Sequence, residues 1–203
     1  MISFIYKAIR FFIAKVLNIY SQLVTMSLMK INNVTLGKNF ISRGIPKLYI
    51  QGSMKVGTNF KINNTITNNP IGRNYKCMFV VRYGARLVIG NNVGMSGTTI
   101  VAQKSIIIGD NVKIGGNVCI YDTDFHSLDA QTRADRKEDF LNTNKKDIFI
   151  SDNVFIGAHS TILKGIHIGK NAIIGACSVV TKDIPENQIW AGNPARYIRE
   201  IEV

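Results

Sequence analysis

An aliphatic residue returns every six positions through the C-terminal half of the chain. The repeated position holds isoleucine or valine at Ile150, Ile156, Ile162, Ile168, Ile174 and Val180. The same spacing recurs at Ile108, Ile114 and Ile120, at Ile89 and Met95, at Ile50, Val56 and Ile62, and more loosely from Ile31. A helix repeats about every 3.6 residues, so a period of six instead indicates short strands that turn a corner in every hexad. Gly and Asn recur beside the aliphatic residue, and both tolerate the backbone angles of a tight bend.

Stacked turns of such a chain predict a prism-shaped β-solenoid over residues 31–184, with a ladder of aliphatic side chains inside and neighbouring strands about 4.8 Å apart. Two segments depart from the period. Residues 63–86 keep it poorly, which predicts an irregular coil. Residues 127–147 are charged and lose it entirely, which predicts a loop that projects from the prism and can cover a site.

The net charge of +12 is concentrated in the first half of the chain, since no Asp or Glu precedes Asp110. These basic residues are scattered singly and form no stripe that would follow a phosphate backbone, so we do not expect a nucleic-acid partner. The three cysteines form no CxxC pair, and we expect reduced thiols in a cytoplasmic protein.

Residues 1–30 predict an amphipathic helix, because apolar residues recur at helical spacing at Ile2, Ile5, Ile9, Phe12, Ile13, Val16, Ile19 and Leu23. Lys7, Arg10 and Lys15 interrupt it, and the longest uncharged stretch, Val16–Met29, is shorter than the about 20 residues of a membrane span. The charges also argue against a cleavable signal peptide. Two alternatives remain: a helix docked on the domain, or one lying on an anionic membrane surface.

His126 is the candidate catalytic residue, because it ends the segment IYDTDFH where regular structure meets the projecting loop. Asp122 and Asp124 precede it on the same side of an extended strand. A carboxylate that binds one ring nitrogen leaves the other nitrogen free to act as a general base. We expect His167 to be a surface or structurally satisfied histidine, and His159 lies within a hexad.

The sequence resembles the hexapeptide-repeat acyltransferases, in particular the maltose, galactoside and nodulation O-acetyltransferase branch and the bacterial polysaccharide O-acetyltransferases. The segments IYDTDFH, IFISDNVFIGAHSTIL and GACSVVTKDIPENQIWAGNPARYIREI carry the resemblance. It implies a left-handed parallel β-helix, a homotrimer and acetyl-CoA as the acyl donor, without a metal. It also implies that His126 is the general base, with direct attack of the acceptor hydroxyl on the thioester.

The resemblance implies further site residues. Residues 185–203 would form a tail that binds coenzyme A, together with small residues along the pantetheine and basic residues near the phosphates: Ala158, Ala176, Thr181, Lys182, Arg196 and Arg199. Phe155 would line the site. Several relatives carry an Asn against the acceptor sugar at the position of Met95, which makes Ser96 the substitute candidate.

We therefore expect an O-acetyltransferase that acts on a sugar hydroxyl in bacterial capsule, lipopolysaccharide or related glycan synthesis. The basic first half and the N-terminal helix favour a glycan carried on a membrane-bound diphosphate lipid. The protein would be cytoplasmic, and peripheral at the inner membrane face if the helix binds lipid.

Three alternatives fit the sequence less well. N-acetylation of a nucleotide-linked amino sugar is disfavoured, because relatives of that kind often carry an N-terminal nucleotide-binding domain that residues 1–30 cannot form. A metal-dependent hydratase of the same fold binds zinc through three histidines, the last two about five positions apart, whereas His159 and His167 are eight apart. An inert scaffold fits poorly with His126 and the basic tail.

Overall fold

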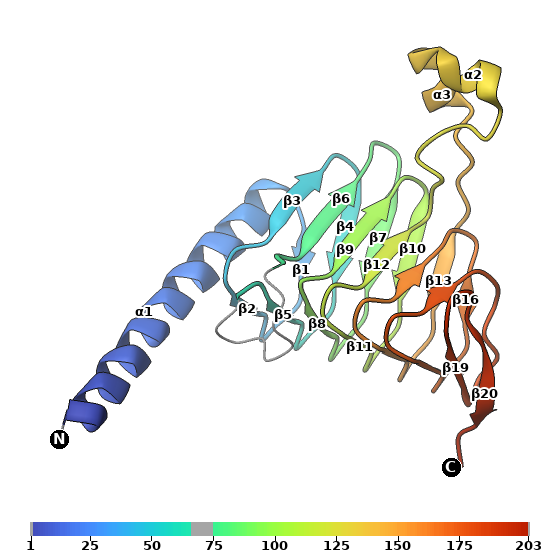
Figure 1. Ribbon diagram of the computed structural model, residues 1–203. Helices are drawn as coiled ribbons and strands as arrows, with labels where there is room; N and C mark the ends of the chain where they lie inside the picture. Colours follow the sequence, from blue (N-terminus) through green and yellow to red (C-terminus); the bar gives the residue numbers. More distant parts are fainter. Residues whose placement is uncertain (1, 66–74, 203) are drawn as a thin grey trace.

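The computed structural model describes residues 2–65 and 75–202, which form a stack of β-coils with a long helix at one end (Figure 1). Sheet A contains β1 (Thr35–Leu36), β4 (Ser53–Val56), β7 (Arg86–Ile89), β10 (Ser105–Ile108), β13 (Ile148–Ile150) and β16 (His167–Ile168). Sheet B contains β2 (Ile41–Arg43), β5 (Lys61–Asn63), β8 (Gly94–Ser96), β11 (Lys113–Ile114), β14 (Phe155–Ile156), β17 (Ile173–Ile174), β19 (Gln188–Ala191) and β20 (Arg196–Glu200). Sheet C contains β3 (Lys47–Ile50), β6 (Met78–Val81), β9 (Thr99–Ala102), β12 (Cys119–Tyr121), β15 (Thr161–Ile162) and β18 (Val179–Val180).

From β1 to β18, strands three apart in the chain pair in parallel, so each turn of the coil contributes one strand to each sheet. The repeated aliphatic residues face inward in register. Ile108, Ile150 and Ile168 stack in sheet A, and the equivalent residues of the other two sheets do the same and are buried: Ile114, Ile156, Ile174, Ile120, Ile162 and Val180. The predicted aliphatic ladder is confirmed. The left-handed sense of the coil stays a prediction from the resemblance.

Asparagines turn the corner between sheets A and B, which we call the A–B corner. One asparagine per coil occupies it with φ between +57° and +62°, and adjacent side-chain amides are hydrogen-bonded at 2.7 to 3.0 Å: Asn39, Asn59, Asn92, Asn111, Asn153, Asn171 and Asn187. Asn adopts this left-handed conformation more readily than most residues, because its short polar side chain bonds locally. The expectation that Asn occupies the bends is confirmed.

The irregular coil predicted over residues 63–86 is wrong at its C-terminal end. Residues 66–74 lie outside the described part, but Met78–Val81 form β6, which pairs with β3 and β9. Phe79 and Val81 alternate inward and are fully buried there. A residue-by-residue alternation thus maintains the coil where the six-residue spacing fails.

The projecting loop is confirmed, and it contains two short helices that were not predicted, α2 (Ala130–Ala134) and α3 (Arg136–Leu141). Figure 1 shows them held away from the stack. The base of the loop is closed by the Asp124 amide donating to the Asn144 carbonyl at 3.1 Å, and by the Lys146 amide donating to the Asp122 carbonyl at 3.0 Å. This closure returns the chain to β13 in register with β10.

The N-terminal helix is confirmed as α1 (Ile2–Ile31), and its last third covers the open end of the solenoid. The amide of Gln22 donates to the Phe40 carbonyl at 2.7 Å and accepts from the Ser42 amide at 2.6 Å. It therefore pairs with the outer edge of β2 as another strand would. Ser21, Thr25 and Met29 are buried on the same side of the helix, at helical spacing.

The helix does not pack through the apolar stripe that its sequence predicts. Apart from Ile2, whose side chain is not described, the stripe residues are 48 to 67% exposed: Ile5, Ile9, Phe12, Ile13, Val16, Ile19 and Leu23. The polar face around Gln22 docks instead, because the end of the stack presents unpaired backbone groups.

By length and composition Phe4–Ile31 is apolar enough to cross a membrane, which the interrupting charges had argued against. Because its last third lies on β2, only Phe4–Tyr20 extends beyond that contact. At about 1.5 Å per residue, that part is shorter than the hydrocarbon core of about 30 Å.

Replacing Gln22 by Leu should destabilise the cap, because the Phe40 carbonyl and the Ser42 amide lose their partner without access to bulk water. We expect a loss of about 2 kcal/mol of unfolding free energy and faster amide exchange in β2. Chemical denaturation and hydrogen exchange measure both. Gln51→Leu, at an exposed turn residue, is the matched control; equal losses in the two variants would contradict the capping role.

Candidate active site

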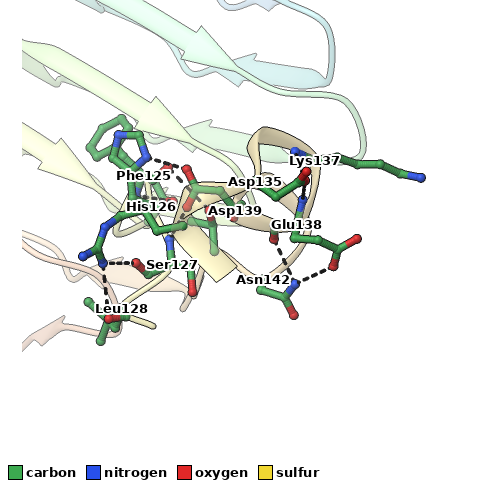
Figure 2. Close-up of polar contacts among 12 residues, drawn as sticks. Phe125, His126, Ser127, Leu128, Asp135, Lys137, Glu138, Asp139 and Asn142 are labelled. Atoms are coloured by element: carbon green, nitrogen blue, oxygen red, sulfur yellow. Dashed lines mark hydrogen bonds and ion pairs between the residues drawn. The ribbon is translucent and has the colours of Figure 1, made fainter. Parts of the chain in front are cut away.

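His126 lies at the corner between sheets C and A, the C–A corner, where the chain leaves the stack for the projecting loop. Its Nδ1 is 2.7 Å from Oδ2 of Asp139 on α3, and Oδ1 of the same carboxylate accepts from the Ser127 amide at 2.6 Å (Figure 2). The imidazole is 68% exposed, whereas Asp139 is 14% exposed. One carboxylate therefore fixes both the histidine ring and the backbone next to it.

The electrostatics of this pair define the role of each group. Hydrogen bonds from the His126 side chain and then from the Ser127 amide hold the pKa of Asp139 below its ordinary value. An ionised carboxylate only accepts hydrogen bonds, so Nδ1 of His126 carries the proton. The Nε2 atom makes no hydrogen bond to the described residues. This is the arrangement of a general base.

The backbone beside the histidine is held in an unusual conformation. Phe125 has φ of +65°, although it is neither Gly nor Asn. Its amide donates to Thr123 Oγ1 at 3.1 Å, and its carbonyl accepts from Thr143 Oγ1 at 3.4 Å. Its ring packs edge-on against that of Tyr121, with the ring centres 5.1 Å apart. Such strain costs about 1 to 3 kcal/mol and persists only where surrounding contacts fix it. Here the contacts set the direction in which His126 leaves the corner.

Neither acid predicted to orient His126 contacts it. Asp122 is fully buried and accepts from the amides of Gln103 and Lys104 at 2.7 and 2.8 Å, and burial raises its pKa. Asp124 forms an ion pair with Lys164 at 2.7 Å. The prediction assumed an extended chain up to His126, but the left-handed residue Phe125 turns the histidine away from both acids.

A sequence signal for Asp139 existed and was missed. Asp135 accepts from the Lys137 and Glu138 amides at 2.9 Å, as the N-cap of α3. The pattern Asp-x-x-Glu is a helix-start signature, so the loop could have been assigned a helix that carries Asp139 in its first turns. Its contact with His126 depends on how the loop folds back.

The residues predicted to line the acceptor side come together on sheet B. Ser96 and Phe155 line a groove of 380 Å³ between β2 and β14, together with Gly115. Met95 also borders it, but its side chain is only 3% exposed and packs in the core. Strand alternation turns the Met95 side chain inward and Ser96 outward, so Ser96 is the better placed of the two to contact an acceptor.

Two of the predicted donor residues lie at the corner between sheets B and C, the B–C corner. Ala158 and Ala176 follow glycines there, and successive turns approach closely: a Cβ on Gly115 or Gly157 would lie 2.5 Å from the amide nitrogen of the alanine on the next coil. The chain before Arg196 is fixed at the same corner, since the Ala195 amide donates to the Val179 carbonyl at 2.8 Å. Ala158, Ala176 and the exposed Arg196 thus share one edge, which we call the donor edge.

The other predicted donor residues lie apart from this edge. Thr181 and Lys182 follow β18, at the C–A corner, and the Lys182 ammonium lies 5.0 Å from the centre of the Trp190 ring. Trp190 closes the C-terminal end of the core, so Lys182 covers that end of the stack. Arg199 is exposed on β20, and its guanidinium donates to the Glu200 carbonyl at 3.1 Å.

The remaining histidines have structural partners. His159 turns the B–C corner with φ of +63°, and its Nδ1 is 3.2 Å from Nδ2 of Asn117. His167 Nε2 is 3.1 Å from Ser151 Oγ. Within residues 2–65 and 75–202 there is no group of three His, Cys, Asp or Glu side chains that could hold a metal ion.

Comparisons with known proteins agree with the repeat and the three-sheet coil. The profile of the family Bacterial transferase hexapeptide (six repeats) matches residues 147–182. The galactoside O-acetyltransferase of Escherichia coli (strain K12) is 42% identical over 120 residues, which cover 59% of this chain and 56% of that protein. The galactoside O-acetyltransferase of Lactococcus lactis is 35% identical over 103 residues, or 51% and 47% of the two chains. The chain thus spans about half the length of these curated relatives.

Two solved structures share the fold over most of the chain. AntD, an N-acyltransferase from Bacillus cereus in complex with dTDP and 3-hydroxybutyryl-CoA, superposes with a TM-score of 0.68 at 20% identity, covering 87% of this chain and 88% of that one. The polySia-specific acetyltransferase NeuO has a TM-score of 0.59 at 25% identity, covering 82% and 81%. The repeat, the three-sheet coil and these relatives together support a hexapeptide-repeat acyltransferase.

Proposed function

We propose that this protein is an acetyl-CoA-dependent O-acetyltransferase that acts on a sugar hydroxyl. The observation that carries the proposal is the His126–Asp139 pair, which presents an imidazole Nε2 at an exposed corner beside a structured loop. The galactoside O-acetyltransferases among the relatives support it, as does the 3-hydroxybutyryl-CoA bound in the AntD structure. The small residues and the arginine at the B–C corner suit a pantetheine arm and a phosphate.

The chemistry follows from the pair. Nε2 of His126 takes the proton of the acceptor hydroxyl as the oxygen forms a bond to the thioester carbonyl carbon. Asp139 stabilises the imidazolium and keeps the ring orientation. When the tetrahedral species collapses, the C–S bond breaks and His126 returns the proton to the leaving thiolate. The enzyme forms no covalent intermediate.

We further propose a homotrimer. On one chain the donor edge and the acceptor groove lie at the B–C corner and on sheet B, whereas His126 lies at the C–A corner and does not line the groove. A neighbouring copy that brings its C–A corner against the B–C corner of the first would complete the site. The coenzyme A tail of residues 185–203 would then lie at the same boundary.

N-acylation of a nucleotide-linked amino sugar is the second candidate, and the shared fold with AntD favours it. The two activities differ in the acceptor atom, so the product separates them. Hydroxylamine cleaves an O-acetyl ester readily but leaves an amide intact.

We place the protein in the cytoplasm, peripheral at the inner membrane face, in capsule, lipopolysaccharide or related glycan synthesis. The exposed apolar stripe on α1 carries this proposal together with Lys7, Arg10 and Lys15, because insertion of apolar side chains and attraction to anionic headgroups act together.

Replacing His126 by Ala should lower kcat for acetyl transfer by about 10²-fold or more and leave the KM for acetyl-CoA nearly unchanged. A general base acts in the chemical step and not in donor binding. Steady-state kinetics with candidate glycans and release of free thiol measure both constants. His167→Ala is the matched control, since that histidine lies on β16 of sheet A and bonds Ser151; near-normal kcat in His126→Ala would end the assignment.

Asp139→Asn should lower kcat about tenfold or more, because the amide does not carry the charge that stabilises the imidazolium. Asp129→Asn, which caps α2 in the same loop without contacting His126, should change kcat little.

In the wild-type protein the pKa of Asp139 lies below its ordinary 3.8. The stabilising contribution of the ionised Asp139 carboxylate is therefore complete above pH 3.8 and is lost as the pH falls through the lowered pKa. The Ser127 amide resonance in NMR should report this loss, and a loss well above pH 3.8 would contradict the pairing.

The full-length protein should sediment with vesicles that contain anionic lipid and should be released as salt rises. Replacing Lys7, Arg10 and Lys15 by Gln should weaken binding, with each charge contributing about 1 kcal/mol. Vesicles of zwitterionic lipid alone are the control. Absence of binding at low salt would remove the membrane from the proposed location.

A further inference from the structure

The acceptor groove on sheet B, called the charged groove below, is lined by cations and by no acid among the residues described. Lys61 and Lys113 are both paired with Gly94, one from each side, so they stand two strands apart across a position without a side chain. Two strand spacings amount to about 10 Å. The Lys113 side chain extends over this gap, since its Nζ lies 4.0 Å from where a Cβ on Gly94 would be, and it donates to the Asn92 carbonyl at 3.1 Å.

A third cation extends the charged groove toward the helix end. Arg43 on β2 lines the same 380 Å³ groove, and its register partner is Asn63 on β5. No carboxylate is among the described residues that line the groove. Three exposed cations without a counter-charge favour an anion, and a diphosphate offers enough oxygen acceptors for all three.

An apolar groove of 640 Å³ lies between α1 and the first coil. Its apolar lining comes from the helix and from one residue of the coil: Phe11, Ile13, Ala14, Leu17, Tyr20 and Ile45. Lys7, Arg10 and Lys76 are the charged residues of this lining, and again no acid lines it within the described part of the chain. The groove thus combines apolar walls with positive charge.

The two grooves adjoin along the backbone. Arg43 lines the charged groove and Gly44 the apolar one, and Asn63 and Asn64 are divided in the same way. The boundary is fixed, because the Gly44 amide donates to Ser21 Oγ at 3.1 Å and Asn64 Nδ2 donates to the Gly44 carbonyl at 3.2 Å. The charged groove reaches Phe155 and Gly115 at its far end, beside Ala158 of the donor edge.

We propose that the acceptor sugar is carried on a lipid diphosphate, with Arg43, Lys61 and Lys113 binding the diphosphate and the groove under α1 binding the lipid chain. This inference rests on the proposed function, because it assigns the acceptor of the same site. The order of the surfaces along the molecule is apolar groove, cations, then donor edge, which matches the order of lipid, diphosphate and sugar in such a molecule. The matched order favours a lipid carrier over a nucleoside diphosphate.

Binding can be tested without catalysis, so its failure is distinct from failure of the acetyltransferase assignment. Calorimetry on the full-length protein would use farnesyl diphosphate, inorganic pyrophosphate, farnesol and dTDP as probes. The double variant Lys61→Gln with Lys113→Gln should weaken the binding of farnesyl diphosphate and of pyrophosphate at least tenfold. The matched control, Lys47→Gln with Lys55→Gln, removes two exposed lysines from sheets C and A and should change neither.

The lipid part has its own pair of variants. The double variant Ile13→Gln with Leu17→Gln, both within the apolar groove, should weaken the binding of farnesyl diphosphate at least fivefold and leave the binding of pyrophosphate unchanged. Phe12→Gln with Val16→Gln, on the exposed stripe outside the groove lining, is the control.

Three results would overturn the proposal: pyrophosphate binding that is insensitive to Lys61 and Lys113, farnesyl diphosphate that binds no tighter than pyrophosphate, or dTDP that binds tighter than farnesyl diphosphate. The last would assign the cations to a nucleotide. Circular dichroism on each double variant confirms that the solenoid is intact.

Discussion

The left-handed turn at each A–B corner is the constraint on which the rest of the structure depends. An asparagine with positive φ turns the corner after each strand of sheet A, and its amide bonds the asparagine of the next coil. Glycines beside this corner let successive turns approach, since a Cβ on Gly57 would lie 2.6 Å from the carbonyl carbon of Gly90. The corner therefore keeps the coils in register. Register in turn decides which side chains stand next to each other on the outer faces, including Lys61, Gly94 and Lys113.

The projecting loop departs from this regularity without disturbing it. Its base is closed by backbone hydrogen bonds at Asp122 and Asp124, and the buried Asp122 carboxylate also binds two amides of the preceding coil. Repeat proteins tolerate insertions when the flanking turns still pair. The insertion supplies the carboxylate that reaches His126, so the regular fold positions the histidine and the irregular segment orients it.

The six-residue spacing predicted the coil, its inward ladder and the position of the loop, because each hexad repeats the same local contacts. It could not predict β6, where alternation replaces the spacing, nor the contact of Asp139, which depends on how a loop folds back in space. Strand alternation would have favoured Ser96 over Met95 as the outward side chain, since Met95 occupies the inward position of its hexad. A phenylalanine in the sequence does not indicate a left-handed conformation such as that of Phe125. This conformation separates Asp122 and Asp124 from the histidine.

The helix α1 shows how an edge interaction can leave an apolar surface free. An exposed strand edge has unpaired amides and carbonyls, and Gln22 satisfies two of them. Because a polar face of the helix meets this need, the apolar stripe stays exposed, and its member Ile13 lines a groove between the helix and the first coil. A cap made by an apolar face would have buried that stripe. The same constraint that closes the solenoid therefore creates the surface that a lipid would contact.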